Sequence, residues 1–323
     1  MRAGNPAMSR TPRVLVVGYN AFDVIVSVSA MPAADTKLNV PAIITCGGGP
    51  GATAAVALAR LGCHVRILTM LTDDEGGRTQ RRELEAAGVD TAGSPVRHGP
   101  GAKAVILVRP DDGARTILWS RGDLPPLPVP DDPEAELAGC DLLYLDGHET
   151  TAAAAMAAAA RRRGLPVVLD AGSVREGTRD LVPLCTDVLA SVAFLADYTG
   201  LGDPVAGLRA LAVGGPARVG VTFGAAGALG LEDGSTVGVA AFAVAAADTT
   251  GAGDAFHAGY AAARLRGAGF PAALRFGAAV AALKCRGWGG RAALPTWPEA
   301  EAFAASAARR PAAAAVAGAD LFA

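Results

Sequence analysis

The sequence predicts an α/β protein in which helices cover both faces of a mostly parallel sheet, with a small β-subdomain attached. From Asp141 onward, short β-branched runs alternate with helix-forming segments, an order that is typical of a parallel sheet. Two glycine-rich turns each lead into a predicted helix. Two β-rich stretches, roughly residues 24–46 and 99–121, interrupt the alternation and predict the β-subdomain.

The N-terminal part of the chain predicts elements of both the main domain and the β-subdomain. Residues 1–12 are expected to form a flexible tail and residues 13–323 a single domain with the β-subdomain inserted. Arg13 to Val17 is a β-branched run that ends at Gly18, which predicts a buried first strand. The further elements expected are strands at 23–28 and 38–45, a helix at 52–61, a strand at 64–71, a helix at 76–87, and a hairpin of strands 102–108 and 115–119 around the turn 111–113.

The C-terminal part is more regular. Its strands are short apolar runs, and its helices are longer segments rich in alanine and leucine. Strands are expected at 142–145, 166–170, 188–190 and 219–223, and helices at 152–163, 194–199, 205–213, 255–265 and 272–284. This alternation indicates helices on both faces of the sheet.

The composition indicates a globular protein in the cytoplasm. Of the 323 residues, 51% are hydrophobic and 19% charged, and 29 basic against 31 acidic residues leave a formal net charge of −2. This balance argues against a nucleic-acid partner, because such proteins neutralise phosphates with basic side chains. No run of about 18 residues is both uncharged and rich in large apolar groups, so no membrane span is expected. Residues 1–12 lack the apolar core of a signal peptide.

The cysteines and histidines predict neither a disulfide framework nor a metal cluster. The five cysteines show no Cys-x-x-Cys spacing, and the four histidines form no ligand pattern. His148 follows a predicted strand, where substrate contact and simple loop polarity are equally good interpretations. His257 is expected to be a packed or capped histidine.

The two glycine-rich turns give the strongest functional signal. They are Gly47 to Thr53 (GGGPGAT) and Asp248 to Asp254 (DTTGAGD). Glycines let the backbone approach a ligand closely, and the free N–H groups at a helix N-terminus favour an anion. The second turn adds the carboxylate of Asp254, which can accept a proton from a hydroxyl that attacks a phosphoryl group. This pattern favours phosphoryl transfer.

Other interpretations of these turns remain open. An aspartate in the first helical turn is most often a capping residue. The first turn also matches the dinucleotide fingerprint at Gly47, Gly49 and Ala52, with Asp73 or Asp74 placed to hold a ribose. That fingerprint usually opens the fold, whereas here it follows the third predicted strand and leaves the second turn unexplained. No GxxxxGK[ST] motif occurs, which argues against a P-loop NTPase.

The two turns, in their order and spacing, resemble the PfkB (ribokinase-like) family of carbohydrate and nucleoside kinases. GGGPGATAAVALARLG (47–62) resembles the N-terminal signature of that family, and DTTGAGDAFHAGY (248–260) resembles the C-terminal one. The resemblance extends from about Arg13 to Leu294. It implies a three-layer α/β/α ribokinase-like fold with a mostly parallel central sheet and a small β-sheet lid, which accounts for the two β-rich stretches. It also implies ATP and Mg²⁺ as cofactors and a homodimer through the lid.

The resemblance implies roles for individual residues. Asp254 matches the catalytic base, and Gly251, Ala252 and Gly253 match the anion hole for the transferred phosphoryl group. On the substrate side, the matching positions are Asp23 for sugar hydroxyls, Gly48 and Gly49 for the glycine pair, and Thr53 where many relatives have asparagine; Lys37, Trp119 and His148 are further substrate candidates.

A second group of positions is implied on the nucleotide side. Thr222, Gly224 and Gly227 resemble the turn that holds nucleotide phosphates and ribose, and Ala281, Lys284 and Cys285 lie on the helix that lines the adenine. Asp248 and Thr250 match positions that bind a monovalent cation, K⁺, through backbone carbonyls in some members.

One departure from the family pattern narrows the resemblance. Many members have an Asn-x-x-Glu element that helps to organise Mg²⁺, where this chain has Ser191 to Phe194 (SVAF). The acid is absent, so Mg²⁺ is expected to be held mainly by nucleotide phosphates and water. This loss and the segment ALKCRGWGGRAALP are similar to the ketohexokinase and sulfofructose kinase branch. His148 and Trp119 replace the arginine and asparagine expected there, which argues against a sulfonate pocket, whereas Lys37 can still face an anionic substrate.

The sequence therefore predicts an ATP-dependent kinase that phosphorylates a ketose-like sugar or sugar derivative, with Asp254 as base. A nucleoside kinase of the same family is the first alternative, for which Tyr19, Phe22 and Trp119 offer the aromatic groups. An NAD-dependent oxidoreductase that uses the first glycine turn is the second.

Overall fold

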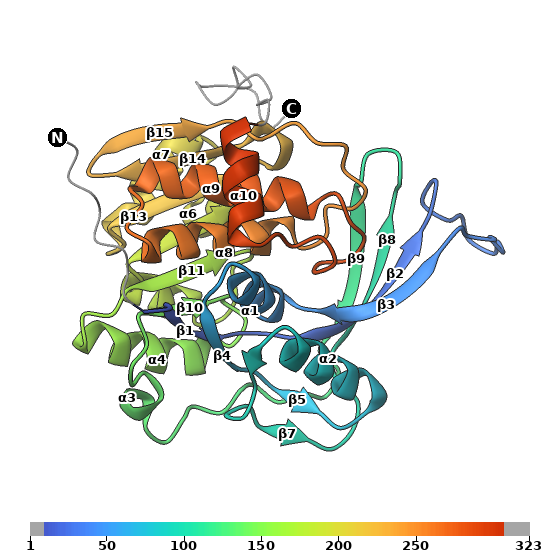
Figure 1. Ribbon diagram of the computed structural model, residues 1–323, viewed down its shortest axis with the longest axis horizontal. Helices are drawn as coiled ribbons and strands as arrows, with labels where there is room; N and C mark the ends of the chain where they lie inside the picture. The colour runs from blue at the N-terminus through green and yellow to red at the C-terminus, as the bar shows by residue number, and fades with distance from the viewer. Residues whose placement is uncertain (1–9, 307–323) are drawn as a thin grey trace.

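A nine-stranded sheet forms the centre of the protein. The computed structural model describes residues 10–306, and Figure 1 shows this sheet between two layers of helices. Its strands, in order across the sheet, are β15 (Ser235–Val239), β14 (Ala228–Glu232), β13 (Arg218–Thr222), β12 (Asp187–Ser191), β11 (Val167–Ala171), β10 (Leu142–Leu145), β1 (Arg13–Val17), β4 (His64–Leu68) and β6 (Val89–Asp90). All neighbours from β6 to β13 are parallel, and β14 and β15 are antiparallel. The predicted mostly parallel sheet is confirmed.

Both faces of the sheet are covered, and the first strand shows how. Val14 and Val16 belong to the core shared with helices α1 (Pro50–Arg60), α8 (Ala252–Leu265) and α9 (Phe270–Lys284). Leu15 and Val17 point to the opposite core, shared with α4 (Thr150–Arg162), α6 (Val192–Thr199) and α7 (Pro204–Val213). A strand whose last four residues are all apolar and buried thus serves both layers. The other helices are α2 (Glu75–Ala86), α3 (Pro133–Glu136), α5 (Thr178–Leu181), α10 (Trp297–Ser306) and the 3₁₀ turns η1 (Val182–Leu184) and η2 (Gly224–Ala226).

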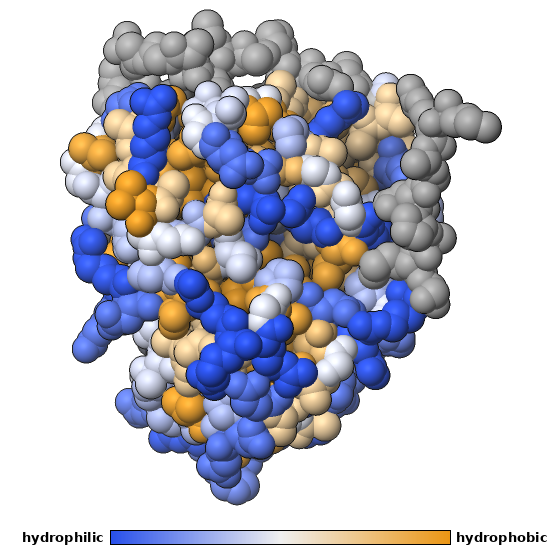
Figure 2. Space-filling view, turned by 90° about the vertical axis from the view of Figure 1, so that its left-hand side faces the viewer, coloured by the Kyte–Doolittle hydropathy of each residue, from blue (hydrophilic) through white to orange (hydrophobic). Residues whose placement is uncertain are grey.

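Small residues bring α8 and α9 into close contact. A Cβ on Gly277 would lie 2.6 Å from the carbonyl oxygen of Phe256, and one on Gly259 would lie 2.8 Å from Val280 Cγ2. The high alanine and glycine content therefore permits close packing between helices in this layer. None of the helices between residues 10 and 306 is both long and apolar enough to cross a membrane. On the face seen in Figure 2, hydrophilic and hydrophobic side chains are intermixed.

The second sheet has four strands and is called the lid below. It consists of β3 (Ile43–Gly48), β2 (Ala21–Ser27), β8 (Lys103–Val108) and β9 (Arg115–Ser120), in that order. It projects from the body of the protein on the right of Figure 1. Alternate residues of β2 face opposite sides: Asp23 and Ile25 are buried, and Val24 and Val26 are partly exposed. The lid therefore has an inner face toward the body and an outer face away from it.

Most strand boundaries lie within two residues of the sequence expectations, and two strands differ by more. The strand expected at 38–45 begins only at Ile43, because the preceding residues form an exposed loop that includes Pro41. The strand expected at 64–71 ends at Leu68. Asn20 donates hydrogen bonds to Thr69 Oγ1 and to the Met70 carbonyl there, and these bonds hold the turn. The chain then continues into β5 (Leu71–Thr72), which pairs with β7 (Val96–Arg97).

The sequence analysis also missed elements. The hairpin of β14 and β15 turns at Asp233 and Gly234, both with positive φ. An Asp-Gly pair between apolar runs is a recognised hairpin signal. The predicted tail at 1–12 and the end of the predicted domain reach into residues 1–9 and 307–323, which lie outside the described part of the chain.

Candidate active site

A cavity of about 670 Å³ lies between the lid and the carboxyl ends of the central strands. The central sheet contributes Asp170, Ser191 and Thr222, at or next to the ends of β11, β12 and β13. This edge is where open α/β sheets bind ligands. Asp23 from the lid and Asp254 from α8 both line the cavity. The two carboxylates that the sequence assigned to substrate and base therefore face one space.

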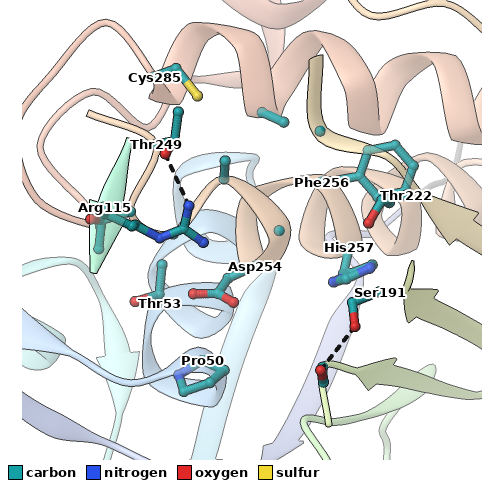
Figure 3. Close-up of a pocket in the computed structure, with 18 of the residues that line it drawn as sticks. Pro50, Thr53, Arg115, Ser191, Thr222, Thr249, Asp254, Phe256, His257 and Cys285 are labelled. Atoms are coloured by element: carbon teal, nitrogen blue, oxygen red, sulfur yellow. Dashed lines mark hydrogen bonds between the residues drawn. The ribbon is translucent and has the colours of Figure 1, made fainter. Parts of the chain in front are cut away.

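The start of α8 opens toward this cavity (Figure 3). Gly251 precedes the helix with φ 74°, and a Cβ there would lie 2.8 Å from Gly290 Cα, so only glycine fits. No side chain caps α8. Within residues 10–306, no acceptor bonds the N–H groups of Gly251 and Gly253, whereas Ala252 N–H donates to the Thr249 carbonyl at 3.1 Å. Two of the three predicted anion-hole amides are thus free to bind an anion.

Asp254 lies in the first turn of α8, half-buried at the wall of the cavity. Its carboxylate points toward Arg115 and Thr53 in Figure 3. Burial, with a further contribution from the charge of Asp170, raises the pKa of Asp254 to about 7, against the effects of His257 and Arg115. A carboxyl group with a pKa near neutral can both take and release a proton at physiological pH.

Asp170, Tyr144 and His257 form a buried polar group behind Asp254. Tyr144 Oη donates to Asp170 Oδ2 at 3.1 Å. His257 Nδ1 lies 2.8 Å from Asp170 Oδ1, although the two are not aligned as a hydrogen bond. His257 is buried, as expected for a packed histidine. Asp170 follows the apolar run VVL, so its position at a strand end was a signal that the sequence analysis did not use.

Arg115 reaches the same place from the lid. Its Nη1 donates to Thr249 Oγ1 at 2.9 Å, and Thr249 Oγ1 donates to the carbonyl of Gly113 at 2.7 Å. The tip of the β8–β9 hairpin is thereby attached to the turn that precedes α8. Arg115 lines the cavity beside Asp254 and was missed in the sequence analysis, because its register in β9 places it there and no local motif marks it.

Asp23 and the first glycine turn form the opposite wall. Asp23 is 4% exposed. Burial, assisted by the charge of Glu83, raises its pKa to about 7, against the effect of Arg291. A Cβ on Gly48 would lie 2.0 Å from Asp23 Oδ2, so this glycine leaves room for the carboxylate. Gly48 itself does not line the cavity, whereas Gly49 does.

Arg291 and Glu83 support that wall from behind. Arg291 Nη2 donates to the Gly48 carbonyl at 2.8 Å, and Nη1 donates to Glu83 Oε2 at 3.2 Å. Gly47 N–H donates to the same Glu83 oxygen at 2.8 Å. This network fixes the glycine turn beside Asp23. The sequence analysis missed it because the two side chains are 208 residues apart in the chain.

Aromatic groups form a third wall, on the substrate side. Tyr19 stacks on His148 with ring centroids 4.7 Å apart, and Trp119 of the lid meets both rings edge-on. All three line the cavity, as do Thr53 and Arg175. Burial and the charge of Arg175 lower the pKa of His148 to about 4, so its imidazole is neutral. Arg175 was not singled out in the sequence.

The positions expected on the nucleotide side are only partly brought together. Thr222, Gly224, Gly227, Ala281 and Cys285 line the cavity, in keeping with the expectation. Lys284 does not line it; this side chain is fully buried, and its Nζ donates to the carbonyl of Asp248 at 2.9 Å. Each residue advances an α-helix by about 100°, so Lys284 is turned away from Cys285 and toward the Asp248 carbonyl.

Two more candidates stand apart from the cavity. Lys37 lies in the exposed loop between β2 and β3 and does not line the cavity. Asp248 is fully buried, and its carboxylate accepts from Thr250 N–H at 2.7 Å and Gly289 N–H at 2.8 Å. Thr250 does line the cavity.

Asp146 holds the start of α1. One of its carboxylate oxygens accepts from Tyr19 N–H at 2.7 Å and Gly51 N–H at 2.8 Å, and the other accepts from His148 N–H at 2.9 Å. A Cβ on Gly18 would lie 2.7 Å from Asp146 Oδ2, so glycine is required for this contact. Burial raises the pKa of Asp146 to about 6.

Asp73 and Asp74, the candidates for a ribose-binding acid, have structural partners. Asp74 caps α2 by accepting from Gly77 N–H at 2.9 Å. Asp73 accepts from Gly99 N–H at 2.9 Å and pairs with the exposed His98. Neither lines the cavity. The dinucleotide interpretation of the first turn therefore lacks the acid that it requires.

The residues present fit a metal that is held mainly by its nucleotide. Between residues 10 and 306, no group of three or more histidine, cysteine, aspartate or glutamate side chains could hold a metal ion. Ser191 occupies the start of the Asn-x-x-Glu position. Its hydroxyl donates to the Gly172 carbonyl, the bond drawn from Ser191 in Figure 3, and it accepts from Phe194 N–H. Mg²⁺ coordinated by ATP phosphates and water is compatible with this wall.

Comparisons with known proteins agree with this geometry. Residues 11–297 match the model of the pfkB family carbohydrate kinases. The chain is 32% identical to the ATP-dependent ribose-1-phosphate kinase of Halopiger xanaduensis, over 91% of this chain and 97% of the relative. It is 28% identical to the ribokinase of Bacillus subtilis, over 89% and 98%.

A solved structure supports the same assignment. A protein of Agrobacterium tumefaciens assigned as a ribokinase has a TM-score of 0.84 and 29% identity, over 92% of this chain and 98% of that one. The ribokinase-like α/β fold is thereby confirmed. The protein is an ATP-dependent phosphotransferase with an alcohol group as acceptor. The chain belongs to the pfkB family of carbohydrate kinases.

Proposed function

We propose that this protein transfers the γ-phosphoryl group of ATP to a hydroxyl of a ketose-like sugar or sugar derivative, with Asp254 as the catalytic base. The observation that carries the proposal is that Asp23 and Asp254 line one cavity into which the uncapped start of α8 opens. Such a site has an acid to hold sugar hydroxyls, a base, and free amides for the transferring group. A cytoplasmic location, where ATP is available, is part of the proposal.

The proposed reaction follows from this arrangement. Asp254 accepts the proton of the acceptor hydroxyl while its oxygen bonds to the γ-phosphorus, and the bond to the bridging oxygen breaks, so that ADP leaves with that electron pair. The N–H groups of Gly251 and Gly253 stabilise the charge on the transferring oxygens. Arg115, which adjoins Asp254, adds a positive charge on the lid side. Mg²⁺ bound to ATP would offset the charge of its phosphates.

The acceptor sugar is the finer part of the proposal. A ketose-like acceptor is what the resemblance to the ketohexokinase and sulfofructose kinase branch implies. The names of the ribokinase and ribose-1-phosphate kinase relatives bring ribose and its phosphate to this chain as the competing acceptors. Either sugar can present its hydroxyls to Asp23 and a reacting hydroxyl to Asp254.

A nucleoside is the second candidate acceptor. The observation in its favour is the aromatic wall of Tyr19, His148 and Trp119, which offers ring faces on which a base can stack. An NAD-dependent reaction has no comparable support, because Asp73 and Asp74 are engaged in hydrogen bonds away from the cavity.

The test is a screen of ADP release with Mg·ATP and the purified chain. The panel contains fructose, ribose, their phosphate esters, a sulfosugar and adenosine, with D254A as the control. We expect a sugar or sugar phosphate to give turnover that D254A abolishes. Preferred turnover of adenosine would select the second candidate, and equal ADP release by D254A would overturn the role of Asp254.

We also propose a homodimer formed through the outer face of the lid. Ile43, Val105 and Leu118 on this face are 62%, 39% and 56% exposed. Val105 and Leu118 are directly paired across β8 and β9, so they form one apolar patch. Sedimentation equilibrium should show a dimer that L118E converts to a monomer. The matched substitution L201E, at a residue 41% exposed outside the lid, should leave the dimer intact.

A further inference from the structure

Arg175 lies against the aromatic wall of Tyr19, His148 and Trp119, and its guanidinium forms no ion pair with a carboxylate of the described residues. Its Nη2 lies 3.1 Å from His148 Nε2, and its charge lies over the Trp119 ring, 5.4 Å from the centroid. Among residues 10–306 no carboxylate lies within ion-pair distance of Arg175, whereas Arg121 next to it pairs with Glu149 at 2.6 Å. Arg175 is half-buried and lines the cavity.

The nearby carboxylates are all engaged elsewhere. Asp146 accepts three backbone N–H groups. Glu149 accepts from Arg121 and from Leu127 N–H. The neutral imidazole of His148 can accept a hydrogen bond from Arg175 but brings no negative charge. Arg175 therefore feels the charges of Asp146 and Glu149 only at a distance and has no ion-pair partner among the described residues, so an anionic ligand would stabilise it.

A second unmatched donor lies in the same wall. The hydroxyl of Tyr19 is buried and has no hydrogen-bond partner in the described part of the chain, while its ring stacks on His148. A planar guanidinium and a hydroxyl together can bond several oxygens of one tetrahedral anion. A carboxylate has only two oxygens to offer, so this donor set favours a phosphate ester.

From these observations, and resting on the proposed kinase function, we infer that the acceptor is a sugar that already carries a phosphate group, held by Arg175 and Tyr19. The enzyme would then produce a sugar bisphosphate. Asp23 holds the hydroxyls of the sugar, and the second phosphoryl group is transferred beside Asp254. Arg175 is in this view a specificity-determining residue, and reactions that release phosphorylated sugars would supply the substrate.

The experiment compares ribose, ribose 1-phosphate, ribose 5-phosphate, fructose, fructose 1-phosphate and ribonate as acceptors. We expect kcat/KM for one phosphate ester to exceed that for its parent sugar by about 100-fold, and R175M to lower kcat/KM far more for that ester than for its parent sugar, which removes most of the preference. R179M, which removes an exposed arginine of α5, is the matched control and should keep the preference. A ribonate preferred over every phosphate ester, or R175M equally harmful to charged and neutral acceptors, would overturn the inference.

Binding separates this inference from the proposed function. Calorimetry on D254N with the same esters measures the subsite without turnover. If D254N binds the esters and the D254N/R175M double variant does not, the subsite is supported even when no acceptor is phosphorylated. The lack of phosphorylation of any acceptor would contradict the kinase proposal instead. Turnover of neutral sugars together with no ester binding by D254N would contradict the subsite alone.

A different observation, at the turn before α8, concerns the expected K⁺. The resemblance implies a monovalent cation at the carbonyls of Asp248 and Thr250. The Asp248 carbonyl already accepts the Nζ of Lys284, which has no exposed surface. Asp248 also holds the turn through its carboxylate bonds to Thr250 N–H and Gly289 N–H. The residues present therefore do not fit a bound K⁺ at this carbonyl.

We propose that the Lys284 ammonium takes the place of that cation, so that turnover needs no added K⁺. In wild-type enzyme, activity at constant ionic strength should change less than about twofold when KCl replaces choline chloride. K284A should lose at least about tenfold in choline chloride and recover with KCl or NH₄Cl. R209M, which removes an exposed cation of α7, should behave as wild type.

Thermal unfolding gives a readout that does not depend on activity. KCl should raise the Tm of K284A relative to choline chloride and leave the wild-type Tm unchanged. Should K284A fail to fold, the wild-type titration still decides, because strong activation of wild type by KCl would overturn the proposal. K284A activity that does not respond to either cation would overturn it as well.

Discussion

The starts of α1 and α8 look alike in the sequence and differ in the structure. Each follows a glycine with positive φ, 86° at Gly49 and 74° at Gly251, and neither is capped by the side chain of its own first residues. At α1 the protein takes up the N–H group of Gly51 itself, since Gly51 donates to Asp146. The first helical bond is the same in both, from Thr53 to the Gly49 carbonyl in α1 and from Ala255 to the Gly251 carbonyl in α8.

At α8 the corresponding groups are left for a ligand. The N–H groups of Gly251 and Gly253 have no acceptor within residues 10–306, and Asp254 stands beside them with an unbonded carboxylate. The difference teaches that a glycine-rich helix start acts as an anion site only where the fold leaves its N–H groups without a partner. The partner at α1, Asp146, comes from a strand about a hundred residues away in the chain.

The largest expected effect is on turnover at α8. D254N should lower kcat by about 10²- to 10⁴-fold, because the attacking hydroxyl loses its base. In the wild type, kcat/KM should rise with pH through about 7 as Asp254 ionises, and this rise should be absent from D254N. D73N, at an exposed carboxylate outside the cavity, is the control. Near-wild-type turnover by D254N would show that the reaction does not take place at the start of α8.

The second effect is on stability at α1. D146A should lower the free energy of unfolding by about 3 kcal/mol, because the N–H groups of Tyr19, Gly51 and His148 lose their acceptor. Urea unfolding at pH 7 measures this loss, with E176Q as an exposed-carboxylate control. A loss below about 0.5 kcal/mol would mean that water replaces the carboxylate and that the start of α1 is not held by it.

The third effect is on stability at α8, where removing the carboxylate should raise the free energy of unfolding rather than lower it. The folded pKa of Asp254 is raised to about 7, so between about pH 4 and pH 7 the folded state keeps a proton that the unfolded state has lost. Stability therefore falls as pH rises through this window. D254N removes the charge, and it should raise the free energy of unfolding by about 1–2 kcal/mol at pH 8 and by almost nothing at pH 4. Urea unfolding at both pH values checks this, and equal effects at the two would contradict it.

The smallest effect is expected at Gly253, and adding a methyl group to each turn tests it. At Gly253 no heavy atom lies within 4 Å of an added Cβ, so G253A should change stability by less than about 1 kcal/mol. At Gly49 an added Cβ would lie 2.5 Å from Asn20 Cα, with φ at 86°, so G49A should cost clearly more, about 2 kcal/mol or above. Comparing the Tm values of G49A and G253A tests whether the first turn is closely packed and the second has room for a side chain.

The sequence predicted well whatever depends on local pattern. The alternation after Asp141 predicted the parallel strands, and the turn at 111–113 predicted the β8–β9 hairpin. The second glycine turn predicted both the start of α8 and the place of Asp254 in the cavity. Each of these depends on residues close together in the chain, which is why one sequence suffices.

The sequence could not reveal what depends on distant partners. Arg291 reaches Gly48 across 243 residues, and Arg115 meets Thr249 across 134. Lys37 was expected to contact substrate because it lies in the lid, but its loop position carries it away from the cavity. Arg175 gains its meaning only from the absence of a carboxylate beside it, which no sequence motif encodes.

The attachment of the β8–β9 hairpin to Thr249 has a consequence for the use of ATP. Arg115 and the Gly113 carbonyl reach this turn only while the lid lies against the body. A nucleotide bound with the lid raised would lack the lid's positive charge, and water would have no positioned competitor for the sugar hydroxyl. Under the proposed function, the attachment of this hairpin would therefore favour transfer to an enclosed acceptor over hydrolysis of ATP.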